Sequence, residues 1–163
     1  MFNGFTPAAG DFLWELAFNN ERVWFNEHKE QFEQTVNEPF KALAAETQAL
    51  MCSRFPEMDC RLHVSRIYRD ARRLFGRGPY KDHLWFSIKH GSILLEGPMF
   101  WFEIGAADYS YGMGFYSATP SQMEAFRRGL DANPARFERI VRKVERGGEF
   151  VLTGEEYKRP KGH

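Results

Sequence analysis

Cysteine is scarce in this sequence, and long hydrophobic runs are absent. Cys52 and Cys60 are the two cysteines among 163 residues. A pair eight positions apart fits neither a disulfide framework nor a zinc site with four ligands, so we interpret both as reduced structural thiols. Eighteen apolar residues never follow one another, and the opening MFNGFTPAAGDFLWEL has no basic leader or cleavage site. We therefore expect a soluble, cytoplasmic protein without a membrane span.

The motifs of several enzyme classes are also missing. The sequence has no GxSxG motif and no P-loop spacing, and no histidine lies at HxH or HxxxH spacing to another. We predict no metal site and no cofactor. His83, between Asp82 and the strand that follows, is the best single candidate for proton transfer, because an imidazole titrates near neutrality. The alternative is that His83 is a surface histidine at the start of a strand, without a chemical role.

Net charge is zero, yet the charges are segregated along the chain. Residues 1–60 carry four basic and ten acidic side chains, a net charge of −6, and residues 84–163 are nearly balanced at +1. The segment 61–83 carries seven basic and two acidic side chains, a net charge of +5. Either this basic segment pairs with the acidic N-terminal half, or it serves a ligand or partner.

Periodicity predicts an α+β fold in a single domain over residues 1–163. Apolar residues recur at helical spacing through most of residues 7–54 and again over 120–132 and 135–146, with Thr6, Asn20 and Thr119 as candidate caps. Between them, period-2 segments from Met58 to Ser117 predict an antiparallel sheet, with a turn at His90–Ser92. No room remains for a helix between successive strands, which excludes a doubly wound sheet.

The second helical segment, ERVWFNEHKEQFEQTV, is expected to bury Val23, Trp24, Phe32 and Val36, and the next one Phe40, Leu43, Ala44, Leu50 and Met51. Trp24, Phe25 and His28 could alternatively form the wall of a site, although core packing explains them more simply.

Four stretches carry a family resemblance over nearly the whole chain: NGF near the start, FLWELAFNNERVWFNEHKEQFE, RIYRDARRLFGRGPYK and the closing YKRPKGH. Together they resemble the domain of unknown function 2461 (DUF2461) family of conserved hypothetical proteins. Its motif, roughly RDxRFSxDKxPYK, matches here at Arg69, Asp70, Arg72, Pro79, Tyr80 and Lys81, and Arg77 keeps the charge of the motif's lysine.

The sequence departs from that motif at three positions. Arg73 and Leu74 stand where the pattern has Phe and Ser, and Gly76 stands where it has Asp. Family members run on past the PKG segment, which leaves open whether this chain lacks a C-terminal segment of the family. The resemblance implies a fold and almost no function.

The basic segment is the best candidate for a functional site. Gly76, Gly78 and Pro79 predict a sharp turn that brings Tyr80 and Lys81 back beside the arginines. An Arg fork, a phenol and an ammonium suit a phosphate or carboxylate, so we expect a small anionic ligand here. The residues predicted to bind it are Arg69, Asp70, Arg72, Arg77, Tyr80 and Lys81.

A second interpretation stays open, in which the arginines form a structural ion-pair network or a surface for a protein partner. Asp70 is expected to pair with Arg72 or with another arginine of the segment. Nucleic acid is disfavoured as a partner, though not excluded, because net charge is zero and the aromatic strand with Tyr109 and Tyr111 lacks a basic pattern. The sequence does not predict whether the protein is an enzyme, nor its oligomeric state.

Overall fold

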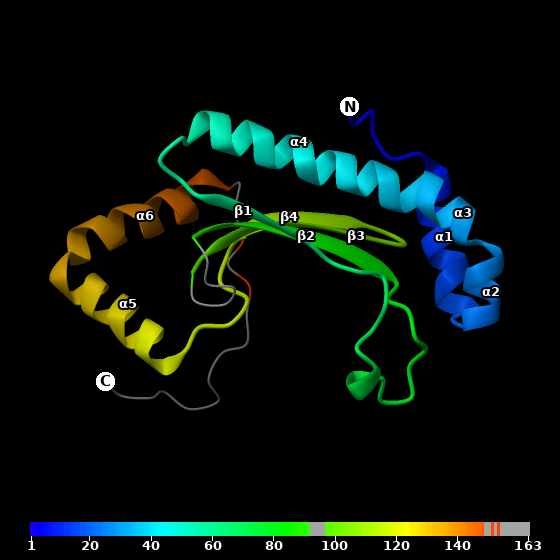
Figure 1. Cartoon of the computed structure of the whole chain (residues 1–163). Coiled ribbons are helices and arrows are strands. Elements are labelled where there is room, and N and C mark those ends of the chain that lie inside the picture. The colour runs from blue at the N-terminus through cyan, green and yellow to red at the C-terminus, as the bar shows by residue number, and fades with distance from the viewer. Residues whose placement is uncertain (92–96, 149–150, 152, 154–163) are drawn as a thin grey trace. The chain divides into compact units, whose positions relative to one another are not determined.

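A computed structural model of the protein describes residues 1–91, 97–148, 151 and 153 (Figure 1). The chain forms two compact units, Met1–Ser117 and Ala118–His163. The first unit contains the N-terminal helices and the sheet, and the second contains two further helices. The single-domain interpretation stays a prediction.

Helices fill most of residues 7–54, as the sequence predicts. Pro7 occupies the first helical position of α1, and Asn19 ends that helix. Pro39 does not break the chain's helical course, because a π-helical turn, η1, precedes it and absorbs the missing backbone donor. The bounds are α1 Pro7–Phe18, α2 Arg22–Glu27, α3 Lys29–Phe32, η1 Glu33–Asn37 and α4 Glu38–Arg54.

The buried face of these helices differs from the expected one at two positions. Val23 and Leu50 are 68% and 63% exposed, so their placement on the apolar face is wrong. Phe25 is buried instead of Val23. For Val23 the reason is a break in helical phase at His28, where φ is −106° and ψ is 13°, so that α2 and α3 do not continue one face. In α4 the buried residues Phe40 and Ala44 recur at four-residue spacing, and Leu50 is not on their stripe. Phe32, Val36, Phe40 and Ala44 are buried as predicted.

The sheet is antiparallel throughout, which confirms the α+β fold class. Its order is β1-β2-β3-β4, and each strand pairs with its neighbour in sequence. The strands are β1 Cys60–Val64, β2 His83–His90, β3 Met99–Gly105 and β4 Tyr109–Gly114. Residues 92–96, which include the expected turn residue Ser92 and the start of the strand expected before Met99, lie outside the described residues.

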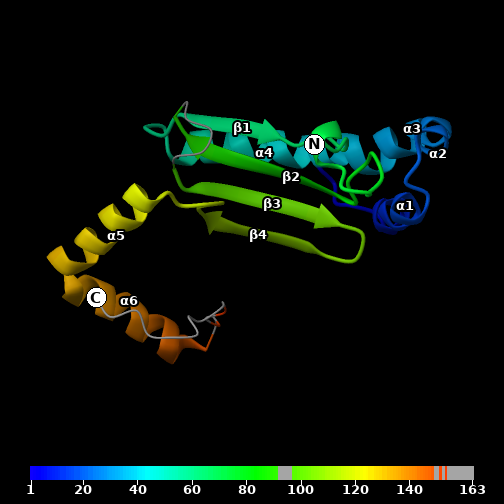
Figure 2. The same cartoon turned by 90° about the horizontal axis from the view of Figure 1, so that it is seen from below.

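One part of the core lies between α4 and one face of the sheet, and the rest gathers buried residues of α1, α2, α3 and the loop between β1 and β2. Figures 1 and 2 both show α4 running over β1 and β2. Phe40 of α4 meets Phe86 of β2 edge-on at a centroid distance of 5.6 Å. Strand alternation places Leu84, Phe86 and Ile88 on this face, and all three are buried. On β4 the same face carries Tyr109 and Tyr111, which stay more than half exposed.

The second unit is a pair of helices, α5 Pro120–Ala132 and α6 Pro134–Gly147. Thr119 caps α5 as expected, because its hydroxyl accepts from the Gln122 backbone amide while the Gln122 side chain accepts from the Thr119 amide. Gly148 ends α6 in the left-handed region, with φ of 65°. Both predicted helices are thereby confirmed.

Candidate functional site

The basic segment between β1 and β2 is held as a closed loop. An isolated antiparallel bridge joins Tyr68 to Tyr80. The Arg69 amide donates to the Pro79 carbonyl over 2.8 Å, and the Lys81 amide donates to the Ile67 carbonyl over 2.7 Å. The bridge sets Arg69 opposite Pro79 and Lys81 opposite Ile67, so Arg69 and Lys81 lie diagonally across it on one face. In Figure 1 the loop projects from the sheet on the side away from α4.

Asn20 fixes the base of the loop across sixty positions of sequence. Its side-chain nitrogen donates to the Tyr80 carbonyl and its oxygen accepts from the Tyr80 amide, both over 2.9 Å. Gly78 permits this approach, since a Cβ there would lie 2.3 Å from the Asn20 oxygen. The expectation that Asn20 caps the second helix is wrong, because Glu21 holds the N-cap position of α2. The sequence offered one clue to the true role, a glycine beside Pro79.

Tyr80 belongs to the core. It is 2% exposed, and its ring stacks on Phe25 at a centroid distance of 4.1 Å with an interplanar angle of 21°. Burial raises the pKa of the Tyr80 phenol, Tyr68 raises it further, and Arg22 opposes them. The structure thus places this predicted ligand residue among aromatic rings, whereas its neighbour Lys81 is only half-buried.

Four predicted residues or their neighbours form what we call the inner group: Arg69, Lys81, Asp82 and His83. The Arg69 side chain is 16% exposed, donates from Nε to the Tyr80 carbonyl over 2.7 Å, and lies 3.6 Å through Nη2 from the Asp82 carboxylate. That carboxylate also accepts from Nδ1 of His83 over 2.9 Å. Asp82 thus links the side chains of Arg69 and His83.

Charges in the inner group perturb one another. Burial lowers the pKa of the Lys81 ammonium, the like charges of Arg69 and Arg66 lower it further, and Glu103 acts in the opposite direction. Burial raises the pKa of Asp82, but the hydrogen bond from His83 and the positive charge of Arg69 outweigh it, so the pKa lies below the usual range. Lys81 therefore lies in a locally positive, partly desolvated place.

The remaining predicted residues lie at the tip of the loop, and we call Asp70, Arg72 and Arg77 the tip group. Asp70 accepts from the Arg72 backbone amide over 3.0 Å and from Nε and Nη2 of the same residue over 3.0 and 2.9 Å. This confirms the predicted pair. The contact raises the pKa of the Arg72 guanidinium, which is otherwise 88% exposed. Arg77 is exposed, and its amide donates to the Leu74 carbonyl to close the turn.

The family of the chain can now be stated. Residues 8–163 match the family described as conserved hypothetical protein (DUF2461). The chain belongs to the DUF2461 family. Comparison with curated proteins and with solved structures found no match. In this DUF2461 chain the matched range contains the whole basic loop and Asn20, which clamps it.

The ion pairs described for the basic loop of this DUF2461 chain do not involve the acidic helices. Within the part of the chain that the structure describes, Arg61 pairs with Asp59, Arg69 with Asp82 and Arg72 with Asp70, and none of these three pairs with a carboxylate of residues 7–54. Among the same residues, no group of three or more His, Cys, Asp or Glu could hold a metal ion, and no helix is long and apolar enough to cross a membrane. The ion pairs of Arg69 and Arg72 thus lie within the basic segment itself.

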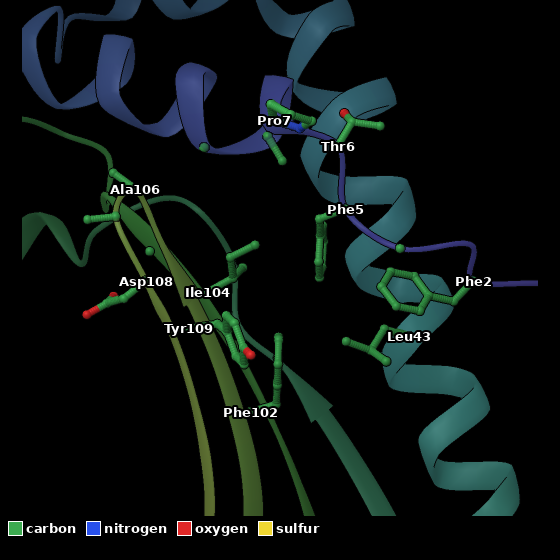
Figure 3. A pocket seen from close by; sticks show the side chains of 15 residues that line it. Phe2, Phe5, Thr6, Pro7, Leu43, Phe102, Ile104, Ala106, Asp108 and Tyr109 are labelled. Atoms are coloured by element: carbon green, nitrogen blue, oxygen red, sulfur yellow. The ribbon is translucent and has the colours of Figure 1, made fainter.

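A separate apolar pocket of about 630 Å³ lies between the N-terminal segment, α1, α4 and the β3–β4 turn (Figure 3). Phe5 and Phe102 face one another in parallel planes at 6.4 Å, and Tyr109 stacks on Phe102 at 6.2 Å. None of the predicted ligand residues lines this pocket, and Asp108 at its edge points away from the rings (Figure 3). Sequence reasoning missed the pocket because its walls come from three stretches that are far apart in sequence: residues 2–10, Leu43 and residues 102–109.

Proposed function

We propose that this DUF2461 protein recognises a small anionic ligand, bearing a phosphate or a carboxylate, at the basic loop. The observation that carries the proposal is the position of the Lys81 ammonium, which is half-buried beside the like charges of Arg69 and Arg66. Holding the Lys81 ammonium partly desolvated near two guanidinium groups costs free energy unless an anion offsets the repulsion. Glu103 and Asp82 supply only part of that compensation.

The proposed roles follow from how firmly each side chain is held. Arg69 is anchored through Nε to the Tyr80 carbonyl and through Nη2 to Asp82, so it presents a fixed guanidinium. Lys81 adds charge on a flexible stem. Arg72 and Arg77 at the exposed tip can close over the anion. His83 lies at the edge of the site, where its Nδ1 bonds to Asp82. Tyr80 supports the site through its backbone, because its ring is buried.

The alternative is a scaffold protein in which the arginines are structural or bind a protein partner. One observation favours it: the guanidinium groups of Arg69 and Arg72 already have carboxylate partners, Asp82 and Asp70. In that case, substitution of a charged side chain of the loop would lower the free energy of unfolding, and no small anion would bind.

Titration calorimetry distinguishes the two. Phosphate, citrate and nucleoside phosphates are titrated into the full chain at low and at high salt. We expect binding that weakens with added salt, and a loss of about 10- to 150-fold in affinity for Lys81→Met and for Arg72→Ala, corresponding to about 1.5–3 kcal/mol per charged hydrogen bond. Methionine keeps the apolar stem of Lys81 while removing its charge.

The matched control is Lys41→Met, which removes one positive charge from the exposed side of α4. It should leave affinity within twofold of wild type. Absence of heat with every anion at millimolar concentration would refute the proposal, as would an equal loss of affinity in Lys41→Met and Lys81→Met, since that pattern indicates only nonspecific charge attraction.

A further inference from the structure

Both cysteines of the chain lie where the end of α4 meets the start of β1. Phe40, Ala44, Gln48 and Cys52 recur at four-residue spacing and therefore form one stripe along α4. The stripe faces the sheet: Phe40 contacts Phe86, Ala44 is fully buried, and Gln48 donates from Nε2 to the Cys60 carbonyl over 2.8 Å. The next turn of this stripe brings Cys52 over the first residue of β1.

Cys60 points toward the same helix. Register places it on the face of β1 that also carries Leu62 and Val64, opposite the buried residues Ile88 and Phe86 of β2. Burial raises the pKa of the Cys60 thiol, and a hydrogen bond with the Cys52 thiol raises it further. Cys52 and Cys60 therefore lie at one junction, with their side chains on the facing surfaces of α4 and β1.

The two thiols differ in access. Cys60 is 6% exposed, whereas Cys52 is exposed to solvent. A small oxidant can thus reach Cys52 first, while the buried Cys60 is protected from the oxidant and serves as the second thiol. This arrangement of an accessible thiol next to a resolving thiol is the one that favours a disulfide over further oxidation.

We propose that Cys52 and Cys60 are a redox modification site, at which a peroxide converts the pair into an intramolecular disulfide. In the first step the Cys52 thiolate attacks the O–O bond of hydrogen peroxide, an S–O bond forms, the O–O bond breaks, and hydroxide leaves and is protonated to water. In the second step the Cys60 thiolate attacks the Cys52 sulfur, the S–S bond forms, the S–O bond breaks, and hydroxide leaves as water with the proton of the Cys60 thiol. Two thiols are oxidised and one peroxide is reduced to two water molecules.

The bond would fasten the last turn of α4 to β1 and close the connection through Pro56. Such a short closed loop restricts the unfolded chain and raises the melting temperature by several degrees. The inference is independent of the anion-binding proposal, because neither cysteine belongs to the basic loop.

The test treats the reduced full chain with stoichiometric hydrogen peroxide, quenches it with N-ethylmaleimide and measures the intact mass. We expect a product about 2 Da lighter than the reduced chain that carries no attached maleimide group. Digestion should then release a peptide in which Cys52 and Cys60 are cross-linked. Dithiothreitol should restore the original mass and two maleimide-reactive thiols. The oxidised protein should melt several degrees higher than the reduced one.

Cys52→Ser and Cys60→Ser are the matched controls, and each should abolish the lighter product. Cys52→Ser is the decisive variant because Cys52 is exposed and its replacement leaves the core intact; its Cys60 should stay reduced under peroxide. Three results would overturn the inference: disulfide-linked dimers in place of the monomeric product, Cys52 that gains about 16–48 Da of oxygen without joining Cys60, or two thiols that still react with maleimide after peroxide.

Discussion

Removing the side chain of Asn20 should destabilise the first unit more than removing the side chain of any exposed asparagine in the same helical region. Asn20→Ala deletes two hydrogen bonds of 2.9 Å to the backbone of Tyr80. The Tyr80 carbonyl keeps a donor, because Nε of Arg69 lies 2.7 Å from it, but the Tyr80 amide loses its acceptor in a part-buried place. Two net hydrogen bonds plus one unsatisfied donor correspond to a loss of about 2–4 kcal/mol.

Urea denaturation followed by tryptophan fluorescence measures this loss, since Trp24 and Trp85 lie in the first unit. The matched control is Asn19→Ala. Asn19 is the adjacent residue, and its side chain makes one exposed hydrogen bond to the Glu15 carbonyl over 3.0 Å. We expect that control to cost about 0.5 kcal/mol, within the range of surface substitutions.

A second variant separates the two bonds. Asn20→Asp keeps an acceptor for the Tyr80 amide but places a carboxylate oxygen against the Tyr80 carbonyl, so it should be nearly as unstable as the alanine variant near neutral pH. If the free energies of unfolding of Asn20→Ala and Asn19→Ala agree within 0.5 kcal/mol or so, the clamp does not stabilise the loop and the reasoning fails.

Three further predictions concern the same loop. Gly78→Ala should destabilise through the 2.3 Å approach to Asn20, and the double variant with Asn20→Ala should lose clearly less than the two single losses added, which a double-mutant cycle in urea would show. Asp70→Ala should lower the free energy of unfolding by more than about 0.5 kcal/mol, because it removes a bidentate ion pair and a backbone cap. Asp59→Ala removes an exposed ion pair of 3.0 Å and should lower it by less. Equal denaturation midpoints for the two variants would contradict this. Lys81 has a lower pKa in the folded chain than its ordinary value of 10.5. Between the folded-state pKa and 10.5 the unfolded chain binds more protons, so the free energy of unfolding rises with pH across that range. In melts recorded over a series of pH values, Lys81→Met should flatten this rise and should not lower the melting temperature at pH 7.

Local patterns in the sequence determined the elements of this protein. Helical spacing and the proline positions placed α1 and α4, and period-2 alternation placed the strands, because these patterns reflect which side of one element faces a core. The pair of Asp70 and Arg72 was also predictable, since two residues of separation let one turn bring the groups together. The same holds for Arg69 beside Lys81, across a turn rich in glycine and proline.

The tertiary structure alone decided which residues from distant segments meet. Asn20 is sixty positions from Tyr80, and helix capping is the role its local sequence suggests, so only the packing of α1 and α2 against the loop reveals the clamp. Tyr80 resembles Lys81 as a ligand residue in sequence, but alternation about the bridge and the ring of Phe25 send it into the core. The proximity of Cys52 and Cys60 likewise depends on both the helical phase of α4 and the register of β1. Spacing along the chain specifies neither, because each depends on how the core packs as a whole.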